Sequence, residues 1–179
     1  RDAAGDGVRE QGDSLLQLTL ITNADNPRRV QMGERVRDGL QALGFAVRFE
    51  ALDFATASAA VLEQRFDLAI LGFERLGADP AALDFFESTA DIPGTGLNFF
   101  SYHNAEVDGW LAQARAMPGC GTPERGELYR QAQRRIYEEI PVIMLSGQVN
   151  RVAVDSAWQG ITAGPWALDS GLEFWRAQP

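Results

Sequence analysis

The feature that most constrains the fold of this chain is an apolar run at Asp67–Leu71 that leads directly into Gly72-Phe73. A continuous apolar run of this length is typical of a strand that is covered on both faces of its sheet. A polar loop follows, and Asp79-Pro80 predicts the start of a helix. Because open parallel sheets bind ligands at loops that leave the carboxyl ends of their strands, this loop is the first place to expect a ligand.

Two strand–helix pairs precede this strand. Leu15–Thr22 is strand-like, and Pro27 suits the first position of a helix that Asn26 caps. Phe45–Leu52 alternates apolar and polar residues, as a half-covered strand does, and the alanine-rich Thr56–Gln64 is predicted to be helical. Strand–helix–strand units of this kind join into parallel sheets through right-handed crossovers. We predict an α/β fold with helices on both faces and the strand order 2-1-3.

In such a sheet the carboxyl ends of all three strands lie on one rim. The loops 23–26, 53–55 and 73–79 would meet there. The helix that begins at Pro27 presents unpaired backbone N–H groups at the same rim, which favour an anionic group, although Asn26 also has the simpler role of a helix cap. Asn23 is therefore a candidate ligand-binding residue.

The second half of the chain has a different character. A glycine- and aromatic-rich loop covers Ile92–Tyr102, and two amphipathic helices are predicted at Asn104–Ala116 and Pro123–Glu139, the second with Thr122 as its cap. Pro141–Leu145 predicts a fourth strand. The remainder is expected to be irregular and contains three tryptophans: Trp158, Trp166 and Trp175.

Composition excludes several classes of function. The net charge of −9 argues against a nucleic-acid partner or an anionic membrane surface. All sixteen basic residues are arginine, which removes every mechanism that needs a lysine. Cys120 and His103 are the single cysteine and histidine, so an internal disulfide, a cysteine zinc cluster and paired-histidine metal motifs are excluded. We predict no cofactor, no metal site and no catalytic residues.

The amino-terminal end differs from the rest. Residues 1–14 contain one large aliphatic side chain, Val8, which is too little apolar surface to order a segment. We predict a disordered linker there and one α/β domain over residues 15–179. The chain begins at Arg1, so we expect a processed product or a fragment of a longer protein. No apolar run approaches the roughly 20 residues of a membrane span.

Several short motifs follow one another in order. Gly72-Phe73 leads into the Asp79-Pro80 turn, Asn98–Asp108 has the spacing Asn-x-x-x-Tyr-x-Asn-x-Glu-x-Asp, and Arg125–Gln133 has the spacing Arg-x-x-x-Tyr-x-x-x-Gln before Pro141-Val142. In this order they resemble the second, carboxyl-terminal lobe of bacterial ABC-transporter solute-binding proteins of the peptide/nickel type (family 5). The likeness extends over roughly residues 15–145.

This resemblance implies a three-layer lobe of the periplasmic-binding-protein-like type II fold, with a mostly parallel sheet of order 2-1-3 and later strands. The parent protein would be a periplasmic or extracellular, membrane-associated receptor without catalysis. It would capture a small solute, a peptide or a related polar molecule, and deliver it to the membrane permease of an ABC transporter. A missing amino-terminal lobe would supply the other half of the cleft, and no nucleic acid is involved.

The resemblance also implies site residues. It places Phe73, Asn98 and Tyr102 near the ligand, where Phe73 keeps the stacking face of the family's usual tryptophan but lacks its indole donor. Nickel is not supported, because His103 is the sole histidine.

One departure concerns the charged contact to a peptide. Peptide-binding members usually carry an aspartate three residues before the Asp-Pro turn, where it pairs with the peptide's amino terminus; here that position is Leu76. Leu76 and the nearby Glu74 are therefore candidate ligand-binding residues as well. Glu74 and Asp79 are alternative acidic groups, although Asp79 also suits the cap of the next helix. A free peptide is thus less strongly indicated than the family alone would suggest.

Two other classes remain open. A small flavodoxin-like or receiver-like regulator would use the same rim, with Asp25 and Asp53 imitating an acidic pocket, but a receiver normally needs a lysine that this chain lacks. A cleft-derived interaction module that has lost solute binding is the third possibility. Solute titration separates this module from a receptor, and phosphorylation by acetyl phosphate tests the receiver.

Overall fold

The structure is a computed structural model that describes residues 2, 5–12, 14–72, 83, 85–119, 121–147, 153–161 and 174–177. Its main sheet consists of three parallel strands, with β3 (Gln17–Asn23) between β4 (Ala46–Leu52) and β5 (Leu68–Ile70). The predicted order 2-1-3 is therefore confirmed. The short third strand is held at its start by Asp67, whose carboxylate accepts a hydrogen bond from the backbone N–H of Thr19 at 2.6 Å.

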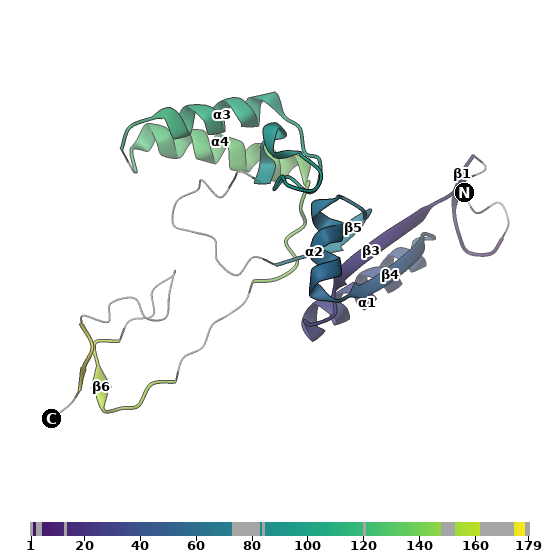
Figure 1. Ribbon diagram of the computed structural model, residues 1–179, viewed down its shortest axis with the longest axis horizontal. Helices are drawn as coiled ribbons and strands as arrows, with labels where there is room; N and C mark the ends of the chain where they lie inside the picture. The colour runs from purple at the N-terminus through teal and green to yellow at the C-terminus, as the bar shows by residue number, and fades with distance from the viewer. Residues whose placement is uncertain are drawn as a thin grey trace.

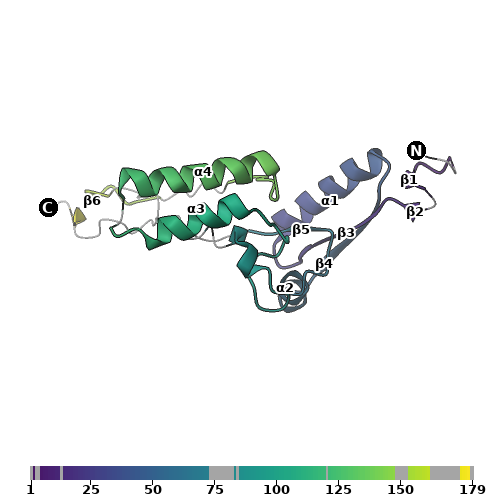
Figure 2. The same cartoon turned by 90° about the horizontal axis from the view of Figure 1, so that it is seen from above.

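Helices cover both faces of this sheet, as Figure 2 shows for α1 (Pro27–Ala42) and α2 (Phe54–Leu62). The predicted cap of α1 is confirmed, because the Asn26 side chain accepts a hydrogen bond from the backbone N–H of Arg29 at 3.2 Å. Asp53 caps α2 in the same way. This cap explains why α2 begins earlier than its alanine-rich run predicts.

Small side chains let the layers approach closely. Ile21 of β3 packs against Ala60 and Val61 of α2 on one face, and all three are buried. On the other face, Gly33 of α1 lies against the ring of Phe49, where a Cβ would come within 2.4 Å of ring carbons. The close packing of α1 on the sheet therefore depends on the absence of a side chain at Gly33.

A helical hairpin of α3 (Ala105–Ala116) and α4 (Pro123–Glu139) lies beside the α/β unit (Figure 1). Both predicted helices are confirmed, and Thr122 caps α4 as expected, since its hydroxyl accepts a hydrogen bond from the backbone N–H of Arg125 at 3.3 Å. The hairpin has a core of its own, which consists of Tyr102, Val107, Leu111, Ala114, Tyr129 and Ala132.

The predicted fourth strand at Pro141–Leu145 is wrong for this structure. The segment has no strand conformation, and Ile143 and Met144 are 72% and 83% exposed. A strand needs a neighbour for its backbone hydrogen bonds, and the described residues offer none here. The pairing found later in the chain is antiparallel, between β6 (Trp158–Gln159) and β7 (Arg176–Ala177), and it is separate from the parallel sheet.

Part of the segment that we predict to be a disordered linker forms a short hairpin instead. β1 (Glu10–Gln11) pairs with β2 (Ser14–Leu15), and the backbone N–H of Arg9 donates to the carbonyl of Gly44 at 2.7 Å. These backbone bonds attach the segment to the end of α1 without needing apolar side chains, which is why composition did not reveal them. The domain boundary at residue 14 stays a prediction. The predicted helix start at Asp79-Pro80 lies outside the described residues.

Candidate functional site

The carboxyl ends of the three parallel strands meet at one rim, as predicted. Asn23 is the last residue of β3 and pairs in register with Leu52 at the end of β4. Gly72 follows β5, and Phe54, which opens α2 directly after β4, is 65% exposed. The rim therefore combines the polar Asn23, the exposed ring of Phe54 and the exposed backbone of Gly72. Ligands of parallel α/β sheets bind at this end of the strands.

An arginine that the sequence reasoning missed lies at this rim. Arg29, in the first turn of α1, donates from Nη1 to the side-chain oxygen of Asn23 at 2.7 Å. Its guanidinium also lies directly over Gly72, where a Cβ would come within 2.4 Å of Nη2. Two features of the sequence could have pointed to Arg29. It lies in the first helical turn after Asn23, which ends a strand, and a glycine, Gly72, follows the third strand of the same sheet.

Two of the predicted site residues lie away from this rim, in the loop that leads into α3. Asn98 is fully buried; its amide donates to the carbonyl oxygens of Glu87 at 3.0 Å and of Tyr102 at 2.7 Å, and its side-chain oxygen accepts from the Tyr102 N–H at 3.0 Å. The Tyr102 hydroxyl donates to the Glu139 carboxylate at 2.6 Å. Burial and this acidic partner raise the pKa of Tyr102 far above its ordinary value. The hydrogen bonds of both side chains are thus made to other parts of the protein, and their role as ligand contacts stays a prediction.

The remaining predicted contacts are Phe73, Glu74 and Leu76, which lie outside the described residues. Their place in the site also stays a prediction. Of the six candidates, the structure brings Asn98 and Tyr102 together in one loop and places Asn23 at the rim.

A hydrogen-bonded network joins the α/β unit to the loop that leads into α3. Gln64, just after α2, donates from Nε2 to the Asp91 carboxylate at 2.6 Å, and Ser101 donates to the same carboxylate at 3.3 Å. His103 Nε2 lies 2.7 Å from the other carboxylate oxygen. The hydrogen bonds from Gln64 and His103 hold the pKa of the Asp91 carboxyl below its ordinary value. Asp91 therefore connects the end of α2 to the loop before α3 through these hydrogen bonds.

One of the two acidic groups of the receiver-like alternative, Asp53, serves as a helix cap here. Asp53 caps α2 by accepting a hydrogen bond from the backbone N–H of Thr56 at 3.0 Å. Hydrogen bonding with the Thr56 side chain, and then with its backbone, lowers the pKa of the Asp53 carboxyl. Among the described residues, no three His, Cys, Asp or Glu side chains gather closely enough to hold a metal ion. In the same part of the chain, no helix is both long and apolar enough to cross a membrane.

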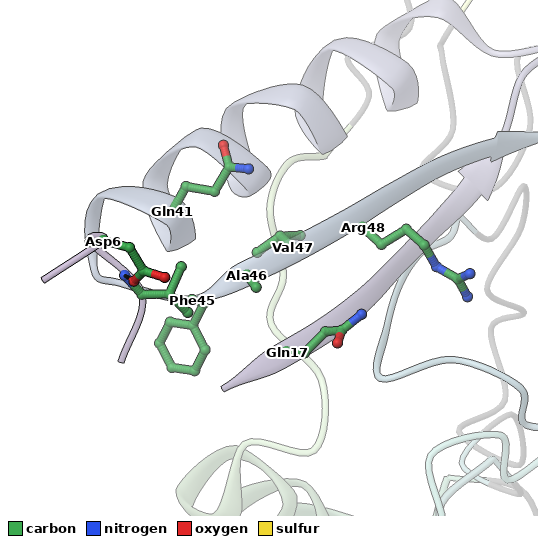
Figure 3. A pocket seen from close by; sticks show the side chains of 9 residues that line it. Asp6, Gln17, Gln41, Phe45, Ala46, Val47 and Arg48 are labelled. Carbon is green, nitrogen blue, oxygen red and sulfur yellow. Dashed lines mark hydrogen bonds between the residues drawn. The ribbon is translucent and has the colours of Figure 1, made fainter. Parts of the chain in front are cut away.

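An open hollow occurs at the opposite end of the sheet from the rim (Figure 3). It lies beside the start of β4 and the first residue of β3, under the end of α1 and the amino-terminal segment. Its lining residues are Asp6, Gly7, Val8, Gln17, Gln41, Phe45, Ala46, Val47 and Arg48. Because ligands of parallel sheets bind at the carboxyl ends of the strands, we do not assign the hollow to the same site.

The parallel order β4-β3-β5, with helices on both faces, is the arrangement of a lobe of the periplasmic-binding-protein type. Comparison with solved structures supports this class. The whole chain matches 35% of the chain in the structure of the oligopeptide-binding protein AppA from Bacillus subtilis in complex with a nonapeptide, with a TM-score of 0.77 and 24% identity. It also matches NikZ from Campylobacter jejuni in complex with Ni(L-His), with a TM-score of 0.68 and 21% identity over 96% of this chain and 35% of that one.

Sequence comparison leads to the same proteins, although no family model matches the chain. The chain is 25% identical to the oligopeptide-binding protein AppA of Bacillus subtilis over 98% of its own length and 32% of that protein. It is 26% identical to the probable D,D-dipeptide-binding periplasmic protein DdpA of Escherichia coli over 83% of its length and 28% of that protein. This chain is a relative of the peptide/nickel-type solute-binding proteins and spans about a third of their length. The predicted resemblance is confirmed, and the receiver-like alternative is not favoured.

Proposed function

We propose that this chain is the carboxyl-terminal lobe of an extracytoplasmic receptor that captures a small solute, a peptide or a related polar molecule, for import by an ABC transporter. The observation that carries this proposal is the match of the whole chain to about a third of peptide-bound AppA. The lobe would present its rim to a cleft that the rest of the receptor closes. Such a protein works by binding and release, so no residue is assigned a catalytic role.

The partners and location follow from the same proposal. The receptor would act in the periplasm or outside the cell, remain associated with the membrane, and deliver its solute to the permease. The strongly acidic chain does not favour a nucleic-acid partner.

An exposed apolar surface at the end of α4 and in the segment that follows it supports a second, amino-terminal lobe as a partner. It consists of Tyr137, Ile140, Ile143, Met144 and Leu145, all exposed. A run of large exposed apolar side chains is typical of a surface that another polypeptide covers. The backbone amides of 143–147 should exchange hydrogen slowly in the intact receptor and quickly in this chain alone. Equal exchange in both proteins would exclude this surface as the contact between the lobes.

Isothermal titration of the intact receptor with peptides, sugars and opines tests the proposed function. We expect one of these classes to bind the intact receptor, while the 179-residue chain binds the same solute weakly or not at all, because it supplies half of the contacts. A micromolar Kd for the chain alone, roughly −8 kcal/mol, would contradict the half-site. Failure of every solute class would favour an interaction module that has lost solute binding.

A further inference from the structure

Resting on the proposed function, we propose that Arg29 binds an anionic group of the solute, a carboxylate, at the rim of the sheet. The inference starts from the surroundings of its charge. Arg29 is partly buried, and its side-chain hydrogen bond within the described residues goes to the neutral amide of Asn23. Within the described part of the chain, no carboxylate lies within ion-pair distance of it.

Most other arginines of the described chain are neutralised or solvated. Six of them form ion pairs with acidic side chains: Arg37, Arg48, Arg65, Arg115, Arg130 and Arg135. Arg28 and Arg35, which have no such partner among the described residues, are exposed to water. Arg125, which is also partly buried, is bonded to the protein instead: its Nε donates to the carbonyl of Ala114 at 3.0 Å, and its guanidinium lies over the ring of Tyr129. A partly buried cation loses hydration and gains most from an anion that replaces it. Arg29 is in this situation, in a chain whose net charge is −9.

The guanidinium is also held in one orientation. Asn23 fixes Nη1 from the end of β3, and Gly72, after β5, lets Nη2 approach the backbone closely. A guanidinium has five N–H donors in a planar fork that matches the two oxygens of a carboxylate. Because the fork is positioned before a ligand arrives, less conformational entropy is lost on binding.

The class of solute follows from the charges available. Leu76 takes the place of the aspartate that would pair with a peptide's amino terminus, so this sequence lacks the usual partner for a cation. The rim carries a cation instead. The recognised group should therefore be a carboxylate, either the carboxyl terminus of a peptide or the acid group of a small organic acid.

A titration of this 179-residue chain with sodium acetate, at constant ionic strength, tests the site without knowledge of the solute. Acetamide is the uncharged control ligand. The backbone amide of Gly72, read by NMR, should shift along a saturating curve with acetate and remain unchanged with acetamide. A linear response, or equal responses to the two probes, would overturn the proposal.

Variants then assign the response to this arginine. Arg29→Gln should weaken acetate binding by about tenfold or more, because charge-assisted hydrogen bonds are lost. Arg29→Lys keeps the charge without the fork and should have an intermediate effect. Arg35→Gln is the matched control, since it removes the same charge from the same helix about 9 Å farther along. Thermal unfolding confirms that each variant is folded, and acetate binding retained in a folded Arg29→Gln would refute the assignment.

Titration of the intact receptor distinguishes the two sources of the carboxylate. The probes are tri-alanine with a free carboxyl terminus, its carboxyl-terminal amide, and succinate. Weaker binding of the amide identifies a peptide terminus, and binding of succinate alone identifies an organic acid. If solutes bind with no preference for the carboxylate form, the inference is wrong while the receptor function stands. If the chain responds to acetate but the receptor binds no solute, the proposed function is wrong while the anion site stands.

Discussion

Two polar regions of this molecule use similar side chains in different ways. At the rim, Asn23 holds Arg29, whose guanidinium keeps donors free of any hydrogen bond to the described residues. In the loop before α3, Asn98 and Tyr102 direct their polar atoms to partners inside the protein. Hydrogen bonds made internally contribute to stability, whereas unused capacity at a partly buried surface is available to a ligand. We therefore expect substitutions in the loop to affect folding and those at the rim to affect binding.

The largest effect should come from Asn98→Ala. The change removes three internal hydrogen bonds and leaves the buried carbonyl of Tyr102 without this donor. We expect a loss of about 3 kcal/mol or more in the free energy of unfolding, measured by urea denaturation. Asn23→Ala is the control at the rim and should cost about 1 kcal/mol or less. Equal losses would remove the distinction between the two regions.

A smaller effect is expected for Tyr102→Phe, which removes only the hydroxyl that donates to Glu139. The buried ring stays in place, so the free energy of unfolding should fall by about 1 to 2 kcal/mol. Tyr137→Phe is a matched control because that side chain is 83% exposed, and it should have no measurable effect. Similar unfolding midpoints for wild type and Tyr102→Phe would show that the buried hydroxyl is not stabilising.

The hydrogen bonds to the Asp91 carboxylate should make the free energy of unfolding depend on pH in the acid range. Its pKa is lowered in the folded state, so its contribution to stability is complete above the unfolded value of about 3.9 and is lost as the pH falls through the folded pKa. Asp91→Asn should flatten this part of the stability profile between about pH 5 and pH 2. Gln64→Ala removes the hydrogen bond that lowers the pKa of Asp91 most and should move the loss of stability to higher pH. The measurement is the urea midpoint of unfolding of each protein across this pH range. If Asp91→Asn shows the same dependence of stability on pH as the wild type, Asp91 is not its source.

The smallest change in stability is expected for Gly72→Ala. The new methyl group would displace the Arg29 guanidinium, which is the end of a flexible side chain and can move at little cost to folding. We expect a loss of stability below about 1 kcal/mol but weaker binding of acetate, read at the backbone amide of Asn23. Gly39→Ala in α1 is the control, because its Cβ would meet no atom within 4 Å. Unaltered acetate binding in Gly72→Ala would mean that the position of the guanidinium is unimportant.

Much of the fold could be predicted because its determinants are local. The cap at Asn26 and the β-α-β-α-β order were sufficient to predict the parallel sheet and the rim. The strand predicted at Pro141–Leu145 was wrong, because strand formation depends on a neighbour and not on the segment alone. Only part of the candidate site could be predicted from the sequence, because neighbours in space determine which polar atoms of a side chain already form hydrogen bonds.

The sequence by itself determined the order of the elements around the rim and the start of α1, because capping side chains and apolar periodicity act within a few residues. It also determined the departure at Leu76, which is a matter of residue identity. Only the tertiary structure decided that Asn98 is bonded internally and that Arg29 lies between Asn23 and Gly72. The three rim residues come from β3, α1 and the end of β5, and the packing of these elements brings the arginine to the place where a solute would bind.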